Sequence, residues 1–340
     1  MSTNGSWSNR LLRFEPVLQE RLWGGDRLAR LFGRELPAQT PVGESWELFA
    51  FAGRSVRVGR GTSAGRWLSE LIRSGRVPVS EAERRSGTFP LLFKWIDANR
   101  PLSVQVHPPD DHPLLPPGHR GKTECWVVVD AEPGAELYVG LQGAGAEELR
   151  EAVRCGEVER LLRREPVVPG DVIFVPSGTV HAIGAGVVLA EIQQPSDVTF
   201  RLYDWQRVDP TTGQPRTLHV EEGLACLCEH PQAGRVRPVP VHRSDGLRLE
   251  SLLTERQCPV FVLQRATVSR RVRGTIPRPW SVWMVVQGQA VAAVGNRREL
   301  LRSGDTALIL GDADFELEPT AAPVVLLETR LPDTGFTAWL

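Results

Sequence analysis

The chain is poor in cysteine and has no long hydrophobic run. Five cysteines in 340 residues are a sparse and odd set, which argues against a disulfide framework and fits a reducing compartment. No apolar stretch approaches the roughly 18–20 residues that cross a bilayer. The polar segment 1–10 is not followed by the apolar core of a secretory signal. These absences predict a soluble, cytoplasmic protein.

An excess of charge of one sign is also missing. Forty basic and 41 acidic residues give a formal net charge of −1, and no long block of like charge occurs. Nucleic acids and anionic lipid surfaces attract proteins through concentrated basic charge, so neither is expected as a partner. The hydrophobic content of 41% is sufficient for a core, and the length suits one large domain or two smaller ones.

Lysine is almost absent, because 38 of the 40 basic residues are arginine and only Lys94 and Lys122 are lysine. Lysine carries a compact ammonium on a flexible stem, whereas arginine presents a wide planar fork. A cramped anion site would require the former, and chance survival is the alternative. Both lysines lie in segments that carry other candidate site residues, which favours a functional reason.

Proline and glycine, 27 and 32 residues, separate short runs rich in Val, Leu, Ile and Phe. This pattern predicts many short strands joined by turns, as in a barrel or sandwich. Helical periodicity is limited to 65–74, 146–164 and roughly 220–228. We therefore expect a mainly β fold with a few added helices. The clearest strand segments are 124–129, 171–175, 187–192, 260–264, 282–286 and 307–310.

A proline-rich segment without periodicity, 231–246, predicts a domain boundary. We place a first domain at 1–235, a linker at 236–245 and a second domain at 246–340. The two halves are related, since His181 follows Gly170-Asp171 at the same spacing as Phe315 follows Gly304-Asp305. The sequence thus suggests a duplicated small barrel in which only the first copy kept its polar site.

Three segments of the first domain carry side chains that suit a divalent metal. Strand alternation places Ser103, Gln105 and His107 on one face. Glu124 lies in a second polar segment and His181 ends a further strand. Two imidazoles and one carboxylate on separate strands form a metal site with an open position for substrate. Gln105 could supply a fourth, weaker oxygen ligand.

The motifs around these residues resemble the type I phosphomannose isomerase family of cupin barrels. The segment from Gly170 to His181 meets the second cupin signature, Gly-x5-Pro-x-Gly-x2-His. The resemblance covers roughly residues 14–220 in the family's order, and the length resembles the short bacterial form. Its motifs are Arg21-Leu-Trp-Gly-Gly25, Gly43-Glu-Ser-Trp46, Phe89-Pro-Leu-Leu-Phe-Lys94, Leu102-Ser-Val-Gln-Val-His-Pro108, Gly121-Lys-Thr-Glu124, Val175-Pro-Ser-Gly-Thr-Val-His-Ala182, Glu191-Ile-Gln-Gln-Pro-Ser-Asp197 and Arg201-Leu-Tyr-Asp-Trp205.

The resemblance implies two cupin-like jelly-roll barrels, a metal-binding catalytic one with helical additions and a C-terminal one without metal ligands. It implies a zinc-dependent interconversion of mannose 6-phosphate and fructose 6-phosphate, with one Zn2+ per chain. The expected partner is a small sugar phosphate, and the expected assembly is a monomer or homodimer. The implied zinc ligands are Gln105, His107, Glu124 and His181.

The resemblance also implies residues that contact the substrate. Arg201 matches the arginine that the family places over its pocket, and Lys94, Ser103 and Lys122 match polar residues that line it. We therefore expect Lys94 and Ser103 to bind substrate, with Lys122 among the catalytic residues. The same two lysines and Ser103 are candidates for phosphate contact.

Moving a carbonyl from C1 to C2 requires a base for the C2 proton and stabilisation of an enediolate oxyanion. A metal polarises the sugar oxygens, and Arg201 adds charge stabilisation. The candidate bases are Glu191, Asp197 and a metal-bound hydroxide. We prefer Glu191 because it ends an apolar strand, where burial raises a carboxyl pKa.

Other functions use the same residue types. Two histidines and a carboxylate also bind iron or manganese in oxygen chemistry, but Lys94, Lys122 and Arg201 suit a phosphorylated substrate better. A cupin enzyme for another sugar phosphate is a closer alternative. A sugar-phosphate-binding or regulatory protein would carry a closed structural metal site, whereas an open coordination position and a carboxylate base favour catalysis.

Overall fold

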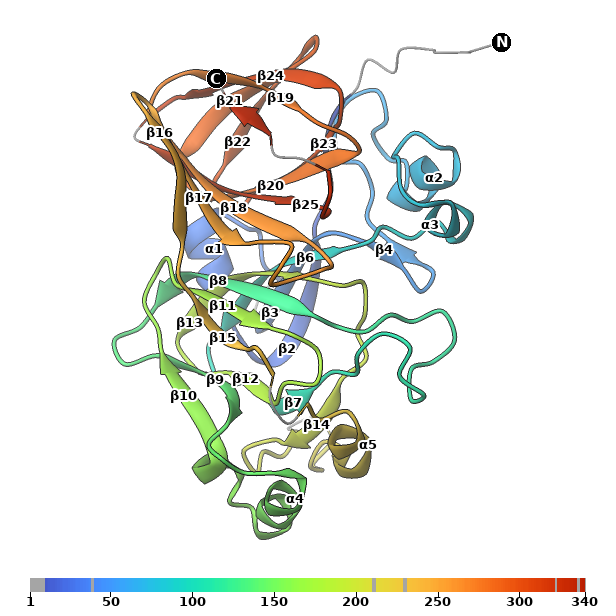
Figure 1. Ribbon diagram of the computed structural model, residues 1–340, viewed down its shortest axis with the longest axis vertical. Helices are drawn as coiled ribbons and strands as arrows, with labels where there is room; N and C mark the ends of the chain where they lie inside the picture. The colour runs from blue at the N-terminus through green and yellow to red at the C-terminus, as the bar shows by residue number, and fades with distance from the viewer. Residues whose placement is uncertain are drawn as a thin grey trace. The chain divides into compact units, whose positions relative to one another are not determined.

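A computed structural model describes residues 10–37, 40–209, 212–228, 231–321, 323–334 and 337–339. The fold is mainly β, as predicted (Figure 1). Contacts divide the chain into two compact units, each made of discontinuous sequence. The central unit comprises residues 18–46 and 91–236, and the C-terminal unit comprises residues 1–17, 47–90 and 237–340.

The central unit is built from a seven-stranded and a five-stranded sheet. Side chains of both sheets share one apolar core, in which Trp126 and Val128 meet Leu137 and Val139. The larger sheet has the order β15 (Gly234–Val236), β11 (Val172–Val175), β8 (Glu124–Ala131), β13 (Val187–Gln193), β6 (Leu92–Ala98), β3 (Val42–Leu48) and β2 (Val17–Gly25). The smaller sheet has the order β10 (Leu162–Pro166), β9 (Glu136–Leu141), β12 (His181–Ile183), β7 (Val104–Val106) and β14 (Phe200–Tyr203).

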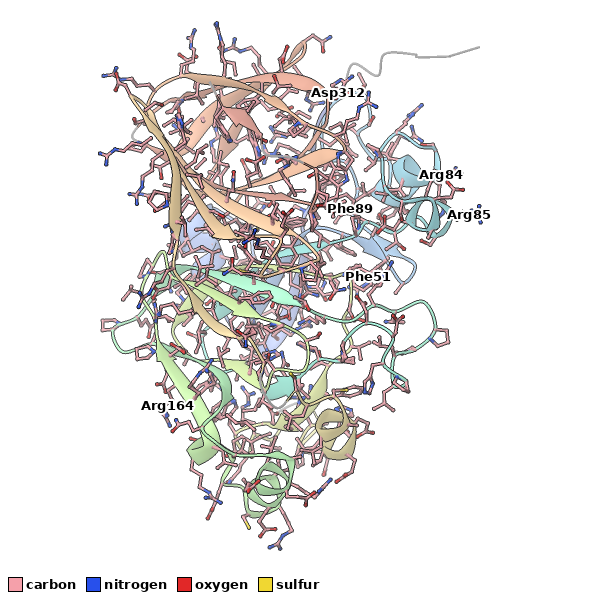
Figure 2. All side chains as sticks on the ribbon, viewed as in Figure 1. Phe51, Arg84, Arg85, Phe89, Arg164 and Asp312 are labelled. Carbon is pink, nitrogen blue, oxygen red and sulfur yellow. The ribbon has the colours of Figure 1, made fainter. Side chains whose placement is uncertain are left out.

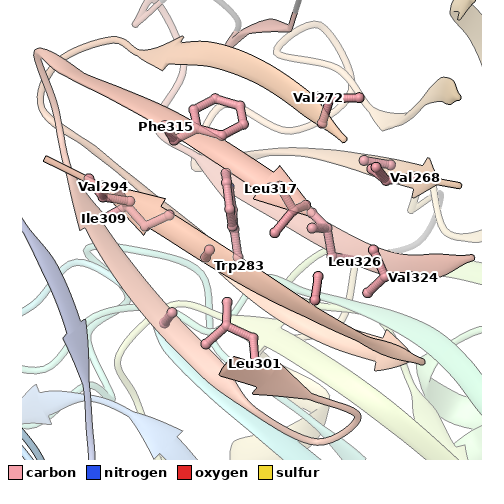
Figure 3. Close-up of a cluster of buried hydrophobic side chains, with 14 of the residues drawn as sticks. Val268, Val272, Trp283, Val294, Leu301, Ile309, Phe315, Leu317, Val324 and Leu326 are labelled. Atoms are coloured by element: carbon pink, nitrogen blue, oxygen red, sulfur yellow. The ribbon is translucent and has the colours of Figure 1, made fainter. Parts of the chain in front are cut away.

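The C-terminal unit also pairs a seven-stranded with a five-stranded sheet. Its core combines Trp283 and Ile309 of the larger sheet with Phe315 and Leu317 of the smaller one (Figure 3). The larger sheet has the order β1 (Leu11–Arg13), β23 (Thr306–Leu310), β20 (Trp280–Gln287), β25 (Val324–Arg330), β18 (Val262–Val268), β17 (Leu247–Leu253) and β16 (Val239–Ser244). The smaller sheet has the order β22 (Arg297–Arg302), β21 (Gln289–Val294), β24 (Ala313–Pro319), β19 (Val272–Ile276) and β26 (Ala338–Trp339). A separate two-stranded sheet pairs β4 (Ala50–Phe51) with β5 (Arg54–Ser55).

The two units repeat one strand order, because the consecutive strands β6 to β14 occupy the same places as β18 to β26. The turn before β11 also matches the turn before β23. Gly170 and Gly304 adopt positive φ angles of 96° and 86°, and Asp171 and Asp305 each accept a backbone N–H from three residues earlier, at 2.9 and 2.7 Å. These features agree with a duplication. That each copy is a cupin barrel stays a prediction.

The helices are short and differ in part from the predictions. The predicted helix over 146–164 is too long, because Gly156 ends it with a left-handed φ of 71° and the chain then enters β10. α3 escaped prediction because it is polar on every face: it buries no residue, and Arg84 and Arg85 point outward and pair with Glu81 (Figure 2). The helices are α1 (Arg27–Phe32), α2 (Leu68–Arg73), α3 (Glu81–Ser86), α4 (Ala146–Cys155) and α5 (Val220–Ala225), with a 3-10 turn at Val158–Leu161.

The predicted domain boundaries stay a proposal. The central unit ends at Val236, close to the predicted linker 236–245, which contains β16. Residues 47–90, which the sequence analysis placed in the first domain, cluster with the C-terminal unit. Among the described residues, every helix is too short or too polar to cross a membrane.

Candidate active site

Strand pairing in the central unit brings three metal-binding side chain types together. His107 follows β7, Glu124 begins β8 and His181 begins β12. Glu124 Oε1 lies 3.3 Å from His181 Nε2, and Glu124 Oε2 lies 3.8 Å from His107 Nε2. All three side chains are buried, with their ligand atoms within 4.8 Å of one another, and no other such group occurs in the part of the chain that the structure describes.

The surroundings of both histidines suit metal binding. His107 Nδ1 donates to the Val198 carbonyl at 2.9 Å, and His181 Nδ1 donates to the Thr179 carbonyl at 2.8 Å. A carbonyl only accepts, so each Nδ1 carries the hydrogen and each Nε2 presents a lone pair to the group. Burial, with the charge of Lys122, lowers the pKa of His181 to about 3 and that of His107 well below its usual value. Both imidazoles are therefore neutral, the form that binds a metal.

Gln105 lies opposite His181 in the β7–β12 ladder. Its Nε2 is 3.2 Å from His181 Nε2 and 3.4 Å from His107 Nε2. The two ends of an amide have the same shape, so a half-turn of the side chain presents the oxygen to the same point. Gln105 thus has the position that a fourth ligand needs.

Lys122 shows that this group accommodates a cation. Its Nζ lies 2.6 Å from Glu124 Oε2 and 2.8 Å from His107 Nε2. Burial raises the pKa of Glu124 to about 7 although Lys122 opposes the shift. A buried carboxylate of this kind requires positive charge close by. The donor set of two imidazole nitrogens, a carboxylate and an amide fits a divalent metal.

A charged cavity of about 420 Å³ lies beside this group, because Gln105 and Lys122 contact the group and also line the cavity. A larger hollow of about 580 Å³ near Gly140 lacks such a cluster of charges, so the chemistry favours the smaller one. The cavity brings together seven predicted site residues, Lys94, Ser103, Gln105, Lys122, Glu191, Asp197 and Arg201, and further residues without a predicted role, Arg21, Trp23, Glu44, Trp46, Ile96, Leu102, Thr199 and Arg216.

One wall of the cavity is a row of alternating charges. Lys94 Nζ lies 2.7 Å from Glu191 Oε2 and 3.7 Å from Glu44 Oε2. Glu44 also accepts from Arg21 Nε at 2.8 Å and from Trp46 Nε1 at 2.5 Å. Burial acts to raise the pKa of Glu44, but Lys94 and Arg21 outweigh it and lower the pKa to about 2. This wall is therefore ionised and rigidly paired.

Glu191 occupies a fully buried strand, β13, where a carboxylate is exceptional. Trp126 Nε1 donates to its Oε1 at 3.1 Å. The expectation of a raised pKa is wrong: burial acts in that direction, but Lys94 and Lys122 outweigh it and leave the pKa of Glu191 below its usual value. Asp197, the other candidate base, is exposed at the cavity.

Another part of the cavity lining carries two arginines, Arg201 and Arg216. Arg216 Nε donates to Asp204 Oδ2 at 2.8 Å, and Arg207 Nη2 donates to Asp204 Oδ1 at 2.5 Å. Arg201 Nη1 donates to the Thr217 carbonyl at 2.8 Å. Burial and the charge of Arg216 lower the pKa of Arg201. Positive charge is thus concentrated around these residues.

Sequence reasoning missed three charged residues of the cavity. Arg21 and Glu44 lie in the family motifs 21–25 and 43–46. The tryptophans and glycines beside them were the signal that could have identified both as site residues. Arg216 lies in the segment after β14, where no motif marks it, so only its position in the folded chain reveals it.

Fold and site together define a mainly β protein with a metal-binding group beside a charged cavity. Residues 11–116 match the family model of the phosphomannose isomerase type I catalytic domain. The chain is 37% identical to the mannose-6-phosphate isomerase of Streptococcus mutans over 299 residues, which is 88% of this chain and 92% of that protein. It is also 37% identical to mannose-6-phosphate isomerase ManA of Bacillus subtilis over 319 residues, 92% and 98% of the two chains.

A solved structure with a similar fold points to the same family. The crystal structure of the mannose 6-phosphate isomerase from Bacillus subtilis aligns with a TM-score of 0.84 at 28% identity and covers 95% of this chain and all of that one. The chain belongs to the type I phosphomannose isomerase family.

Proposed function

We propose that the chain catalyses the metal-dependent interconversion of mannose 6-phosphate and fructose 6-phosphate. The observation that carries this proposal is the buried His107–Glu124–His181 group beside a cavity lined by cations and an ionised carboxylate. Family membership gives the substrate. The expected partner is therefore a small sugar phosphate.

The proposed cofactor is one Zn2+ per chain, held by Gln105, His107, Glu124 and His181. Nitrogen and oxygen donors of this kind suit zinc. When bound, the ion polarises the sugar oxygens as a Lewis acid.

The side chains of the cavity supply the proton transfer. Glu191, ionised and held by Lys94 and Trp126, takes the C2 proton and returns it to C1. Asp197 is the second candidate for this role, and it is less suited because it is exposed to solvent, whereas Glu191 is buried. Lys122 and Arg201 offset the negative charge that develops on the enediolate.

Lys94 and Ser103 are the proposed substrate-binding residues. Both are buried and line the cavity. Because Lys94 is already paired with carboxylates on both sides, it suits a neutral sugar hydroxyl, to which Ser103 can also donate.

The test is a coupled assay of mannose 6-phosphate conversion to fructose 6-phosphate on protein of known metal content. We expect chelation to remove activity and zinc to restore it. Folded, zinc-loaded protein without turnover would overturn the proposal and favour a sugar-phosphate-binding role or another sugar phosphate as substrate.

We also propose a cytoplasmic location, where phosphorylated sugars are found, and a monomer or homodimer in solution. Light scattering of the purified protein distinguishes these two assemblies from larger ones.

A further inference from the structure

The four residues that follow β14, Asp204–Arg207, form a strained turn. Arg207 N donates to the Asp204 carbonyl at 3.0 Å. The two residues between them, Trp205 and Gln206, have φ angles of 55° and 54°. A turn with positive φ at both central positions usually carries Gly, Asn or Asp there, because the left-handed region is unfavourable for a large side chain. The fold therefore holds a tryptophan where a glycine would be less strained.

Two side chains of this turn donate to consecutive backbone carbonyls. Trp205 Nε1 donates to the Leu102 carbonyl at 2.6 Å, and Arg207 Nη1 donates to the Pro101 carbonyl at 2.6 Å. The carbonyl of Leu102 and the backbone nitrogen of Ser103 belong to the same planar peptide group. The bond from Trp205 therefore fixes the peptide plane that directly precedes Ser103.

Ser103 depends on this backbone for its position. It is buried, lines the cavity and lies directly before β7, the strand of Gln105. Its hydroxyl forms no hydrogen bond with any residue that the structure describes, so side-chain contacts do not orient it. A rotation of the preceding peptide group moves the hydroxyl within the cavity, and small displacements of a group that positions substrate lower its effectiveness.

We propose that Trp205 is a positioning residue whose indole N–H, directed at the Leu102 carbonyl by the strained turn, sets the place of the Ser103 hydroxyl in the cavity. Strained backbone persists only where surrounding contacts over-determine it, and it gathers at functional sites. The indole also packs against Tyr138 and Tyr203, with ring centres 5.5 Å apart in both pairs. That a sugar phosphate contacts Ser103 rests on the proposed function, but the link between Trp205 and Ser103 does not.

The test is a double-mutant cycle of Trp205→Phe and Ser103→Ala. Phenylalanine keeps an aromatic ring beside the two tyrosines and lacks the N–H donor. We expect Trp205→Phe to raise KM for mannose 6-phosphate about three- to tenfold, the range for one neutral hydrogen bond. Because the contact is present in both ground and transition states, kcat should stay within about twofold. In the Ser103→Ala background the same change should raise KM less than about twofold, since the hydroxyl that Trp205 places is already gone.

Gln206→Gly is the matched control. Gln206 occupies the other left-handed position of the turn and is exposed. Glycine adopts this conformation readily, so KM should stay within about twofold of the wild-type value. If Trp205→Phe does not fold, Arg207→Met removes the companion bond to Pro101, and its effect on KM should likewise shrink in the Ser103→Ala background.

Hydrogen exchange of the backbone amides of residues 102–104, measured by mass spectrometry without substrate, gives a second readout. Exchange should be faster in Trp205→Phe than in wild type and unchanged in Gln206→Gly. An equal rise of KM with and without the Ser103 hydroxyl would indicate a merely structural role and overturn the proposal. Unchanged exchange in Trp205→Phe would overturn it as well.

The two readouts separate this proposal from the proposed function. Wild-type protein that does not convert mannose 6-phosphate, combined with faster exchange in Trp205→Phe alone, would refute the isomerase and retain the positioning role. Wild-type protein that converts mannose 6-phosphate, combined with unchanged exchange and no coupling between Trp205 and Ser103, would do the opposite.

Discussion

The central and C-terminal units place different chemistry on the same strand positions. In the central unit, Gln105 is paired across the small sheet with His181 on one side and with Arg201 on the other. In the C-terminal unit, the corresponding Gly274 is paired with Phe315 and Trp339. A candidate metal ligand and a cavity arginine are thus replaced by two aromatic rings.

The large sheets show the same correspondence. Trp126 lies opposite Glu191, as Trp283 lies opposite Glu328. Lys94 lies opposite Glu191 on the other side, where Gln264 lies opposite Glu328. The C-terminal unit therefore keeps the tryptophan and the carboxylate but replaces the lysine with a neutral amide. Glu124 corresponds to Ser281 by the same pairing. Glu124 pairs with Val175, the fifth residue after Gly170, and Ser281 pairs with Ile309, the fifth residue after Gly304.

Glu191 and Glu328 show what a neighbouring cation does to a buried carboxylate. Glu328 accepts from Ser281 at 2.9 Å, from Trp339 Nε1 at 3.3 Å and from Thr337. Burial raises its pKa, and these donors together with Arg330 do not reverse the shift. Glu191, equally buried, has a lowered pKa because of its lysines. The adjacent ammonium, and not the position on the strand alone, thus decides the direction of the pKa shift of the buried carboxyl.

In the C-terminal unit, aromatic rings occupy the positions of the polar site. Trp339 stacks on Trp283 with ring centres 5.6 Å apart, and Phe315 meets Trp339 edge-on at 5.0 Å. Figure 3 shows Trp283 and Phe315 within the apolar cluster. No group of three metal-binding side chains occurs among the described residues of this unit. The positions that carry polar side chains in the central unit therefore carry core residues in the C-terminal unit.

The largest expected difference between the copies concerns metal and activity. His181→Ala should remove zinc binding and reduce kcat/KM by roughly a thousandfold or more, since the metal supplies several kcal/mol of transition-state stabilisation. Metal analysis and the coupled assay measure both. Phe315→Leu, at the corresponding position, is the control. It should leave zinc content unchanged, and a loss of zinc in that variant would contradict the comparison.

Trp339→Ala tests the aromatic filling of the C-terminal unit. It should lower the free energy of unfolding by about 3–5 kcal/mol, because a large buried ring leaves a cavity. Urea denaturation measures this change, and added indole should recover part of it by filling the cavity. Val241→Ala, at an exposed position, should change stability by less than about 0.5 kcal/mol. If the two variants were equally stable, the ring would not fill a core.

Lys94→Gln replaces the lysine beside Glu191 with the amide that Gln264 places beside Glu328 in the C-terminal unit. Without the ammonium, the pKa of Glu191 should rise toward that of an unpaired buried carboxyl. The acidic limb of the pH profile of kcat/KM should therefore move to higher pH, with activity near neutral pH reduced about ten- to a hundredfold. An unmoved acidic limb would show that Glu191 is not the base. Gln264→Lys serves as the converse variant and should leave the limb in place.

The smallest expected effect is a change in the pH dependence of stability. The pKa of Glu328 is raised in the folded protein, so the protonated carboxyl contributes to the free energy of unfolding. This contribution is fully present below the unfolded pKa of 4.5 and is lost as the pH rises through the folded pKa. Glu328→Gln should abolish this decline. Urea unfolding of both proteins at several pH values from about 4 upward tests the prediction, and equal slopes would contradict it.

Local sequence patterns were sufficient for much of the site. Alternation placed Gln105 and His107 on one face of a strand, although β7 itself ends at Val106, and the spacing from the Gly-Asp turn located His181. Short-range geometry decides these features, so they can be read from the chain. The helix after Ala146 was predicted too long because periodicity continued past Gly156 while the backbone could not.

The sequence by itself determined the mainly β class, the duplication signal, the candidate ligand set and the family resemblance, because each depends on residue type and spacing along the chain. Only the tertiary structure decided the pairing of Lys94 with Glu191, the direction of the Glu191 pKa shift and the presence of Arg216 at the cavity. These depend on distances of a few ångströms between residues remote in sequence, and strand register and burial set those distances only once the chain has folded.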